Sequence, residues 1–199
     1  MFIKVNKITA DKLNEIARLH KMTYPSDHFT SRFSPSLLSA YYKKLVATNP
    51  YSLVAVTQDG NCVGVAIAGE NTEKSVKDFI RKNWFRLIPV LLTNPFFILK
   101  KMMDFTELFF ENKRRFRSKA KMRYLNLLVH PDLMRLGIAA QLTAELEKEF
   151  IHNGIKMYGH SVKSSNEKTI QFHLKNGCEI EFRKGNLVYF IKKLDQVIP

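Results

Sequence analysis

Hydrophobic and polar residues follow two different periods along this chain, and the change between them marks the predicted elements. Alternation, or apolar runs of about four to eight residues, favours β-strands, whereas apolar residues three and four positions apart favour helices. Strands are predicted at 2–8, 122–129, 156–162, 178–184 and 187–194, with a further pair in a hairpin at 51–69. Helices are predicted at 9–24, 34–47, about 138–153 and 166–176.

Cap and turn residues mark the ends of several of these elements. Thr9 and Ser34 stand where a helix N-cap is expected, and Pro35 follows at a first-turn position that tolerates proline. Asp59-Gly60 separates the two apolar runs of the hairpin, and Gly154 follows the third helix. These residues therefore predict where two helices begin, where one ends and where the hairpin turns.

Residues 72–121 form a different kind of segment. The pattern is helical but is interrupted near Pro89 and Pro95, because proline lacks the amide hydrogen that a helix interior uses. The uncharged run Leu87–Leu99 has 13 residues. A membrane-spanning helix needs about 20 apolar residues, so this run is too short to cross a bilayer.

The order of the elements indicates the fold class. It reads β-α-α-β-β, then the helical segment, then β-α-β-α-β-β, which predicts an α/β (α+β) protein with a mixed sheet and helices on both faces. A chain of 199 residues is long enough for one such domain. We therefore expect a single domain over residues 1–199, with a basic helical insert at about 71–118.

The charge is strongly basic and unevenly distributed. The chain has 32 lysines and arginines against 18 acidic residues, a formal net charge of +14. Residues 71–123 hold 14 lysines and arginines and five acidic residues, so +9 of this charge lies there. Such a field attracts polyanions, among them phosphorylated cofactors, anionic lipids and nucleic acids, and the charge alone does not choose between them.

The cysteines and the N-terminus favour a cytoplasmic protein. Cys62 and Cys178 lie far apart in the sequence and are expected to be reduced, buried thiols. The first residues lack the long apolar core of a secretory signal. No group of residues has metal-ligand spacing, so no metal is expected.

The junction between the strand at 122–129 and the following helix has unusual chemistry. A helix start leaves backbone amides without partners and carries partial positive charge, which suits a diphosphate. Gly137 permits a tight turn and close approach, Ala139 and Ala140 leave room, and Arg135 adds a charged donor. The alternative is an ordinary strand–loop–helix connection in which Gly137 only makes the turn.

A second motif follows one strand later and completes a resemblance to a known family. Residues 129–150 resemble the acetyl-CoA-binding motif of the GNAT N-acetyltransferases, V-x-P-x-x-(Arg/Gln)-x-x-G-x-(Gly/Ala). Residues 166–178 resemble their N-x-x-A-x-x-F-Y-x-K-x-G-F signature, and the element order matches as well. The resemblance covers residues 3–194 except the insert. It implies a mostly antiparallel sheet and places this chain with the subgroup that has a helical insert after the third strand.

The resemblance also implies which residues bind acetyl-CoA as co-substrate. The amides from Arg135 to Ala140 correspond to those that bind the diphosphate, the edge at 127–129 to the strand that binds the pantetheine arm, and Asn166 to an asparagine that contacts that arm. The implied cofactor-binding residues are Leu127, Leu128, Val129, Met134, Arg135, Leu136, Gly137, Ile138, Ala139, Ala140 and Asn166.

Catalytic candidates follow from the same resemblance and from two departures from it. Met134 replaces the family's Arg/Gln, and His173 replaces the tyrosine that often protonates the leaving thiolate. An imidazolium can supply that proton, so His173 is the predicted general acid. Glu70 and His160 are the candidates for the base that takes the amine proton. His130 and Asp132 are interpreted as turn residues, with Pro131 setting the turn and Asp132 capping it.

The acceptor pocket is expected between the first two helices. Its predicted residues offer aromatic and polar groups to a small polar substrate: Tyr24, Asp27, His28, Phe29 and Arg32. The alternative is a surface loop beside a packed helix. The predicted function is direct acetyl transfer from acetyl-CoA to a small amine, such as an amino sugar or a nucleotide-sugar. A non-catalytic acyl-CoA-binding module and a peptide or protein N-acetyltransferase remain the alternatives.

Three interpretations of the basic insert stay open. It can cover the acceptor site as a lid, lie on an anionic membrane surface as a peripheral contact, or pack on a second subunit in a homodimer. The run "KRRFRSKAK" at 113–121 also suits nucleic acid, but it leads directly into the strand at 122–129, which disfavours nucleic acid as a partner.

Overall fold

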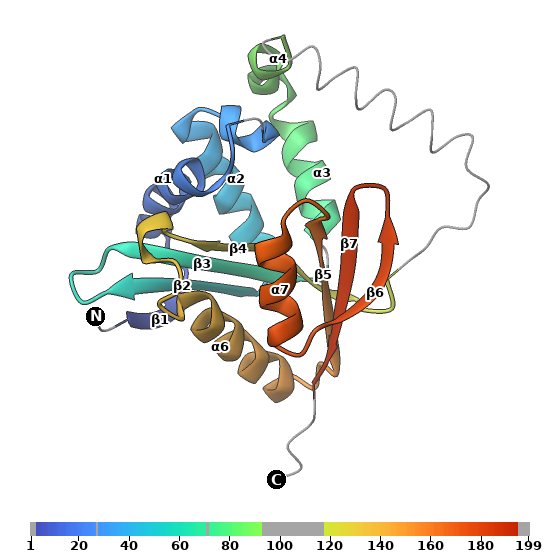
Figure 1. The fold of residues 1–199 in the computed structure, drawn as a ribbon. Coiled ribbons are helices and arrows are strands. Elements are labelled where there is room, and N and C mark those ends of the chain that lie inside the picture. The colour runs from blue at the N-terminus through green and yellow to red at the C-terminus, as the bar shows by residue number, and fades with distance from the viewer. Residues whose placement is uncertain (1–2, 27, 71, 93–117, 195–199) are drawn as a thin grey trace.

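The computed structural model describes residues 3–26, 28–70, 72–92 and 118–194. Seven strands form one sheet in the order β1-β2-β3-β4-β5-β7-β6 (Figure 1). The strands are β1 (Ile3–Lys7), β2 (Tyr51–Thr57), β3 (Cys62–Gly69), β4 (Met122–Val129), β5 (Met157–Lys163), β6 (Glu179–Lys184) and β7 (Leu187–Lys193). Every neighbouring pair is antiparallel except β4 and β5, which are parallel. The expected mixed, mostly antiparallel sheet is confirmed.

Helices cover both faces of the sheet, as expected. Three short 3₁₀ turns accompany them: η1 (Ala10–Lys12), η2 (Phe29–Arg32) and η3 (Pro131–Leu133). The α-helices of the described ranges are α1 (Leu13–Thr23), α2 (Pro35–Thr48), α3 (Thr72–Lys82), α4 (Trp84–Leu92), α6 (Ile138–His152) and α7 (Glu167–Lys175). Figure 1 shows α1 and α2 on one face and α6 and α7 on the other, with α3 leading to α4 at the edge of the body.

Strand periodicity explains how the sheet buries two separate cores. Successive side chains of a strand point to opposite faces, so Val54, Val65 and Ile67 pack under α1 and α2. Leu53 and Ala66 pack under α6 on the other face. Both faces of β2 and β3 are therefore buried, which accounts for their nearly continuous apolar sequences.

Of the two predicted helix N-caps, the structure confirms one and contradicts the other. The Ser34 hydroxyl accepts a hydrogen bond from the Leu37 amide over 3.2 Å, as an N-cap should. Thr9 makes no side-chain cap, and η1 separates it from α1, which begins at Leu13. The predicted N-cap at Thr9 is therefore wrong for the α-helix, because a 3₁₀ turn precedes it.

The helical segment 72–92 breaks at a different position from the one predicted. Pro89 lies inside α4, and the interruption falls at Asn83, between α3 and α4. The Asn83 amide still donates to the Phe79 carbonyl over 3.0 Å, so the chain changes direction without losing its helical bonding. Pro95 and the rest of the predicted insert up to residue 117 lie outside the described residues. Within the described part of the chain, no helix has the length and apolarity to cross a membrane.

Candidate active site

The sheet opens between β4 and β5. These strands are paired at two positions only, which involve residues 122–123 of β4 and 158–159 of β5. Beyond them, 124–129 of β4 stay with β3, and 160–163 of β5 stay with β7. The facing edges therefore carry backbone amides and carbonyls that have no strand partner among the described residues. We call this opening, between 124–129 and 160–163, the wedge.

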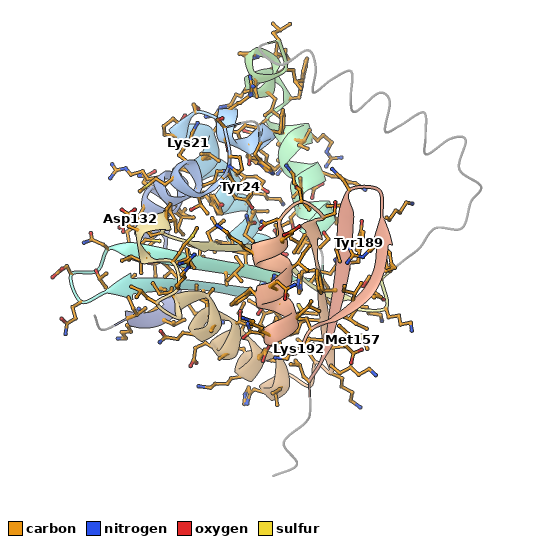
Figure 2. All side chains as sticks on the ribbon, viewed as in Figure 1. Lys21, Tyr24, Asp132, Met157, Tyr189 and Lys192 are labelled. Carbon is orange, nitrogen blue, oxygen red and sulfur yellow. The ribbon has the colours of Figure 1, made fainter. Side chains whose placement is uncertain are left out.

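A β-bulge on β4 lies within the wedge. Tyr124 and Asn126 pair with the consecutive β3 residues 67–68, so Leu125 has no partner of its own. The Nδ2 group of Asn126 donates to the Tyr24 hydroxyl over 3.1 Å. Tyr24, labelled in Figure 2, directly follows the C-terminal end of α1. Asn126 is 5% exposed, and its Oδ1 has no hydrogen-bond partner among the described residues. A buried acceptor of this kind normally has a partner, so Asn126 can bind a donor on a ligand.

The chain between β4 and α6 presents a row of backbone amides. After η3, Arg135 and Gly137 both adopt left-handed backbone conformations, with φ of 70° and 79°. No side chain caps α6 at Gly137. The amides of residues 138–140 therefore lack intrahelical partners and lie at the positive end of the helix dipole. This geometry can bind an anionic group.

Residues 130–132, which precede this row of amides, form a turn as predicted, but the capping residue differs. Pro131 occupies the first position of η3, and the His130 Nδ1 accepts a hydrogen bond from the Asp132 amide over 3.3 Å. His130 rather than Asp132 is therefore the capping residue. Both residues line a cavity of about 400 Å³ between α1, η3 and the β2–β3 hairpin. Cys62 lines the same cavity, and burial raises the pKa of its thiol to about 12.

Two of the three catalytic candidates lie together on the α7 side of β5. The rings of His160 and His173 are 3.7 Å apart between centroids and are tilted by 41°. Burial lowers the pKa of His173 to about 4. Burial, together with the nearby His173 and Arg123, lowers the pKa of His160 to about 2. Both rings are therefore neutral at pH 7. Neither ring nitrogen of His160 has a hydrogen-bond partner within the part of the chain that the structure describes.

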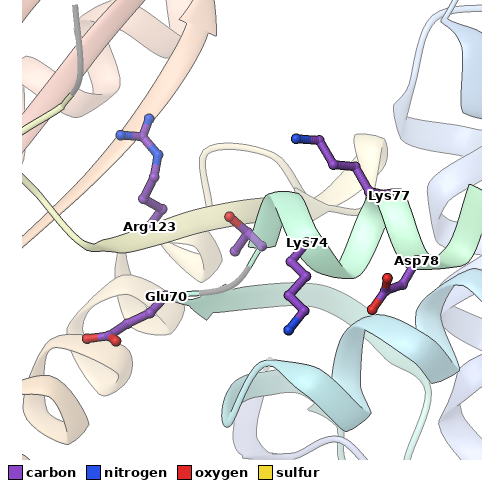
Figure 3. Close-up of a pocket in the computed structure, with 6 residues that line it drawn as sticks. Glu70, Lys74, Lys77, Asp78 and Arg123 are labelled. Atoms are coloured by element: carbon purple, nitrogen blue, oxygen red, sulfur yellow. The ribbon is translucent and has the colours of Figure 1, made fainter.

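The third catalytic candidate, Glu70, lies elsewhere. It follows the end of β3, is exposed, and lines a cavity of about 420 Å³ with Arg123 and residues of α3. Figure 3 shows the Glu70 and Arg123 side chains pointing in different directions, with Lys74 and Lys77 nearby. Asp78 in the same cavity pairs with Lys44. The structure thus brings the two histidines together but does not place Glu70 with them.

The predicted acceptor residues divide into a polar cluster and packing residues. Tyr24 stacks on His20 at 4.3 Å and contacts the His28 ring at 4.4 Å. Phe29 packs edge-on against Phe33 in the core at 5.3 Å. Arg32 is exposed, and Asp27 lies outside the described residues. The region is therefore a polar aromatic cluster over a packed helix, which combines both interpretations of the sequence.

Several polar residues of this cluster are absent from the sequence prediction. Thr30 bridges His20 and His28, with 2.8 Å to a ring nitrogen of each. The other ring nitrogen of His20 bonds the Tyr42 hydroxyl over 2.7 Å. The role of Asn126 could not be predicted, because strand periodicity does not reveal a β-bulge. The only signal was the single polar residue in the apolar run "YLNLLV".

Asn166 has a structural task in α7. Its Oδ1 accepts a hydrogen bond from the Thr169 amide over 3.2 Å and so caps the helix. The residue is exposed. The hypothesis that it also contacts the cofactor arm would require its Nδ2 group, since Oδ1 is engaged by the cap.

Comparisons with known proteins agree with this geometry. The sequence matches the family model described as "Acetyltransferase (GNAT) family" over residues 13–178. The fold is similar to that of the PaiA N-acetyltransferase from Thermoplasma acidophilum in complex with coenzyme A, at 14% identity and a TM-score of 0.60, covering 97% of this chain and 99% of that chain.

Two further solved structures have the same fold. Arylalkylamine N-acetyltransferase 2 from Aedes aegypti is 14% identical with a TM-score of 0.59, covering 98% of this chain and 100% of that one. The ribosomal-protein-S18-alanine N-acetyltransferase from Escherichia coli is 11% identical with a TM-score of 0.56, covering 98% and 95%. No curated protein matches the sequence of this chain.

Proposed function

Because this chain belongs to the acetyltransferase (GNAT) family, we propose that it transfers the acetyl group of acetyl-CoA directly to the amine of a small polar molecule. Acyltransferase activity and the use of acetyl-CoA follow from membership of the family. The acceptor class and the residues that bind each substrate are our proposal, and the wedge beside the uncapped start of α6 is the observation that carries it.

The proposed cofactor path follows the unpaired backbone. The amides of residues 135–140 bind the diphosphate, because they form the one row of amides that combines left-handed turns with an uncapped helix start among the described residues. The edge of β4 at 127–129 then binds the pantetheine arm through backbone groups that β5 leaves unpaired. This path directs the thioester toward the narrow end of the wedge, where the two strands meet.

The proposed chemistry is a direct attack. The amine nitrogen forms a bond to the thioester carbon, the carbon–sulfur bond breaks, and the thiolate of coenzyme A leaves. A backbone amide of β4 stabilises the developing oxyanion. His173 is neutral before the reaction. Because a nearby negative charge raises the pKa of an imidazole, it takes up a proton from solvent as the thiolate forms beside it and passes that proton to the sulfur. His160 positions this ring by a tilted ring contact, with 3.7 Å between the centroids.

The acceptor is proposed to enter from the α1–α2 side of the sheet. Asn126 Oδ1 offers a buried acceptor for an N–H or O–H donor, and Tyr24 and His28 offer aromatic surfaces beside it. Glu70, which is exposed to solvent, is the proposed base through a water molecule. The excess of basic residues favours an acceptor that carries negative charge, such as a nucleotide-sugar.

Two measurements test this proposal together. Calorimetry with coenzyme A should show one binding site, and release of free thiol from acetyl-CoA should accelerate when a small amine acceptor is added. The panel should hold amino sugars, nucleotide-amino sugars, arylalkylamines and short peptides with free amines. Turnover with peptides alone would replace the proposal with a peptide N-acetyltransferase. Binding without turnover on any amine would indicate an acyl-CoA-binding module.

We also propose a peripheral contact between α4 and an anionic membrane surface. Trp84, Phe85 and Leu92 are 51%, 68% and 75% exposed, which is unusual for large apolar side chains. The exposed basic residues Arg81 and Lys82 end α3, one residue before α4 begins. Apolar insertion combined with basic side chains suits an anionic bilayer.

Co-sedimentation with vesicles tests this contact. Vesicles with anionic phosphatidylserine should bind the protein at low salt, and vesicles of phosphatidylcholine alone should bind it less. A Phe85→Ser variant should lose binding to the anionic vesicles. Absence of binding, together with a dimer in sedimentation equilibrium, would assign this surface to a second subunit.

A further inference from the structure

Three side chains that are distant in sequence meet behind the narrow end of the wedge. His160 lies on β5, His173 on α7, and Cys178 directly before β6. One ligand atom from each lies within 4.8 Å of the others, and the residues are 4%, 9% and 5% exposed. We propose that these three residues form a binding site for a thiophilic metal ion, Zn²⁺ or Cu⁺.

The strongest observation for a ligand is the state of His160. Both its ring nitrogens are buried and have no hydrogen-bond partner within the described residues. An unpaired buried polar group is costly, so native proteins rarely leave two such atoms on one side chain without a ligand or an ordered water. His173 and Cys178 are the neighbouring groups that can share a ligand with it.

The donor set decides the class of ion. Two imidazole nitrogens and one sulfur suit Zn²⁺ and Cu⁺, whereas Mg²⁺ and Ca²⁺ require oxygen ligands. Both imidazoles are already in the neutral form that binds metals, because burial lowers the pKa of each. Burial raises the pKa of the Cys178 thiol, so binding breaks its S–H bond, forms an S–metal bond and releases one proton to solvent.

A hydrogen-bond network of neighbouring side chains surrounds the Cys178 sulfur. The Tyr158 hydroxyl lies 4.0 Å from the Cys178 sulfur and donates to Glu147 over 2.6 Å. Glu147 also accepts two bonds from Lys192, at 2.7 and 2.8 Å. This network places the Glu147 carboxylate, together with the Lys192 ammonium that pairs with it, near the sulfur. Because His160 is the first β5 residue beyond the last pair with β4, the wedge provides an entry path.

The donor atoms must move together when an ion binds. Metal–nitrogen bonds of about 2.0 Å and metal–sulfur bonds of about 2.3 Å place tetrahedral ligands roughly 3.3–3.7 Å apart. The present separations are at most 4.8 Å, so the contraction required is no more than about 1 Å. Side-chain rotation of His173 on α7 supplies such a movement without a change in the strands. The fourth position is left for water or another exogenous ligand.

Sequence spacing could not indicate this site. The histidines are 13 positions apart, and Cys178 follows His173 by five, which is no recognised metal motif. The expectation that the chain holds no metal rested on that spacing alone. The parallel crossover through α6 and the return through α7 bring the three residues together.

Cobalt substitution tests the site directly. Metal-free, reduced protein is titrated with Co²⁺, and its absorbance is followed. One equivalent should produce a thiolate-to-cobalt charge-transfer band and the intense visible bands of tetrahedral cobalt, and Zn²⁺ should displace both. A Cys178→Ser variant should lose the charge-transfer band and weaken Co²⁺ binding by at least about 100-fold. The matched control Cys62→Ser removes the other cysteine and should keep both signals.

Circular dichroism shows whether Cys178→Ser is folded, and His160→Gln serves as a second ligand variant if it is not. Absence of the charge-transfer band in the wild-type protein overturns the proposal, as does a band that persists in Cys178→Ser or vanishes in Cys62→Ser. These spectra do not depend on acetyl transfer. Because His173 is the proposed proton donor, Zn²⁺ should also inhibit the transferase, a consequence that rests on the proposed function. If cobalt binds while activity is unchanged, the metal site stands and the role of His173 is wrong.

Discussion

Gly137 gives the sharpest test of the diphosphate site. Its φ of 79° lies in the left-handed region, and a Cβ added there would meet no atom within 4 Å. The substitution Gly137→Ala therefore creates no clash inside the protein. Its cost comes from backbone strain, roughly 1–2 kcal/mol for a non-glycine residue in this conformation. For a chain of this length, 1 kcal/mol lowers Tm by about 2–4 °C.

Gly154 is a matched control at the other end of α6. Its φ is 71°, and a Cβ there also meets nothing within 4 Å. Gly154→Ala should therefore cost the same stability as Gly137→Ala, while it leaves the row of amides at 135–140 untouched. Thermal unfolding without ligand should give two similar decreases in Tm.

Coenzyme A binding should then separate the two variants. A hydrogen bond to a charged group contributes about 1.5–3 kcal/mol, so loss of one amide–phosphate bond corresponds to roughly a tenfold to hundredfold higher Kd. Calorimetry should show this loss in Gly137→Ala, because strain shifts the amides of residues 138–140 and the new methyl group occupies ligand space. Gly154→Ala should bind as the wild type does. Equal affinity in all three proteins would refute the assignment of the diphosphate to this helix start.

Four further predictions concern packing, capping, titration and catalysis. Gly64→Ala should lower the free energy of unfolding by about 1–3 kcal/mol in urea, because the new Cβ would lie 2.9 Å from Leu142 of α6; an unchanged midpoint would contradict this. Ser34→Ala should cost about 1 kcal/mol in the same assay, whereas Thr9→Ala, with no cap to lose, should cost less than half of that. The unfolded state protonates histidine near its usual pKa of 6.5, whereas folded His160 has a pKa of about 2 and stays neutral at pH 5. Lowering the pH from 7 to 5 should therefore reduce the free energy of unfolding by about 2 kcal/mol for this residue, and the reduction should be correspondingly smaller in His160→Gln. His173→Phe should lower kcat by at least about tenfold, and a change within about twofold would remove its role as proton donor.

The strands and most helices were predictable from local chemistry alone. Val, Ile and Leu in short runs with Asp59-Gly60 between them can form little other than the β2–β3 hairpin. Ser34 with Pro35 likewise predicts the start of α2 correctly. The errors in the predicted helix boundaries occur where the chain adopts a conformation other than the one that its local residue pattern favours. The turn at Asn83 and the 3₁₀ turn after Thr9 depend on how neighbouring segments pack, which the sequence pattern does not contain.

The candidate site was predictable only where backbone conformation is encoded locally. Gly137 indicates a left-handed turn by its residue type, and the structure has one there. Arg135 does not, although it adopts the same conformation. The pairing of His160 with His173 depends on the position of α7 over β5, and the position of the buried Asn126 beside the wedge depends on the bulge at Leu125. Such relations are set by sheet register, which periodicity does not determine.

The narrow connection between β4 and β5 has a thermodynamic consequence for the whole molecule. Two antiparallel ladders, β1 to β4 and β5 to β7, share only two residue pairs. The second ladder has its own small core with α7, formed by Val162, Ile170, Cys178, Val188 and Phe190. The C-terminal portion is therefore suited to open as a separate cooperative unit before global unfolding. Amide hydrogen exchange should find one common opening free energy across β5, α7, β6 and β7, lower than that of β2 and β3. A molecule bound across both ladders would merge the two units into one.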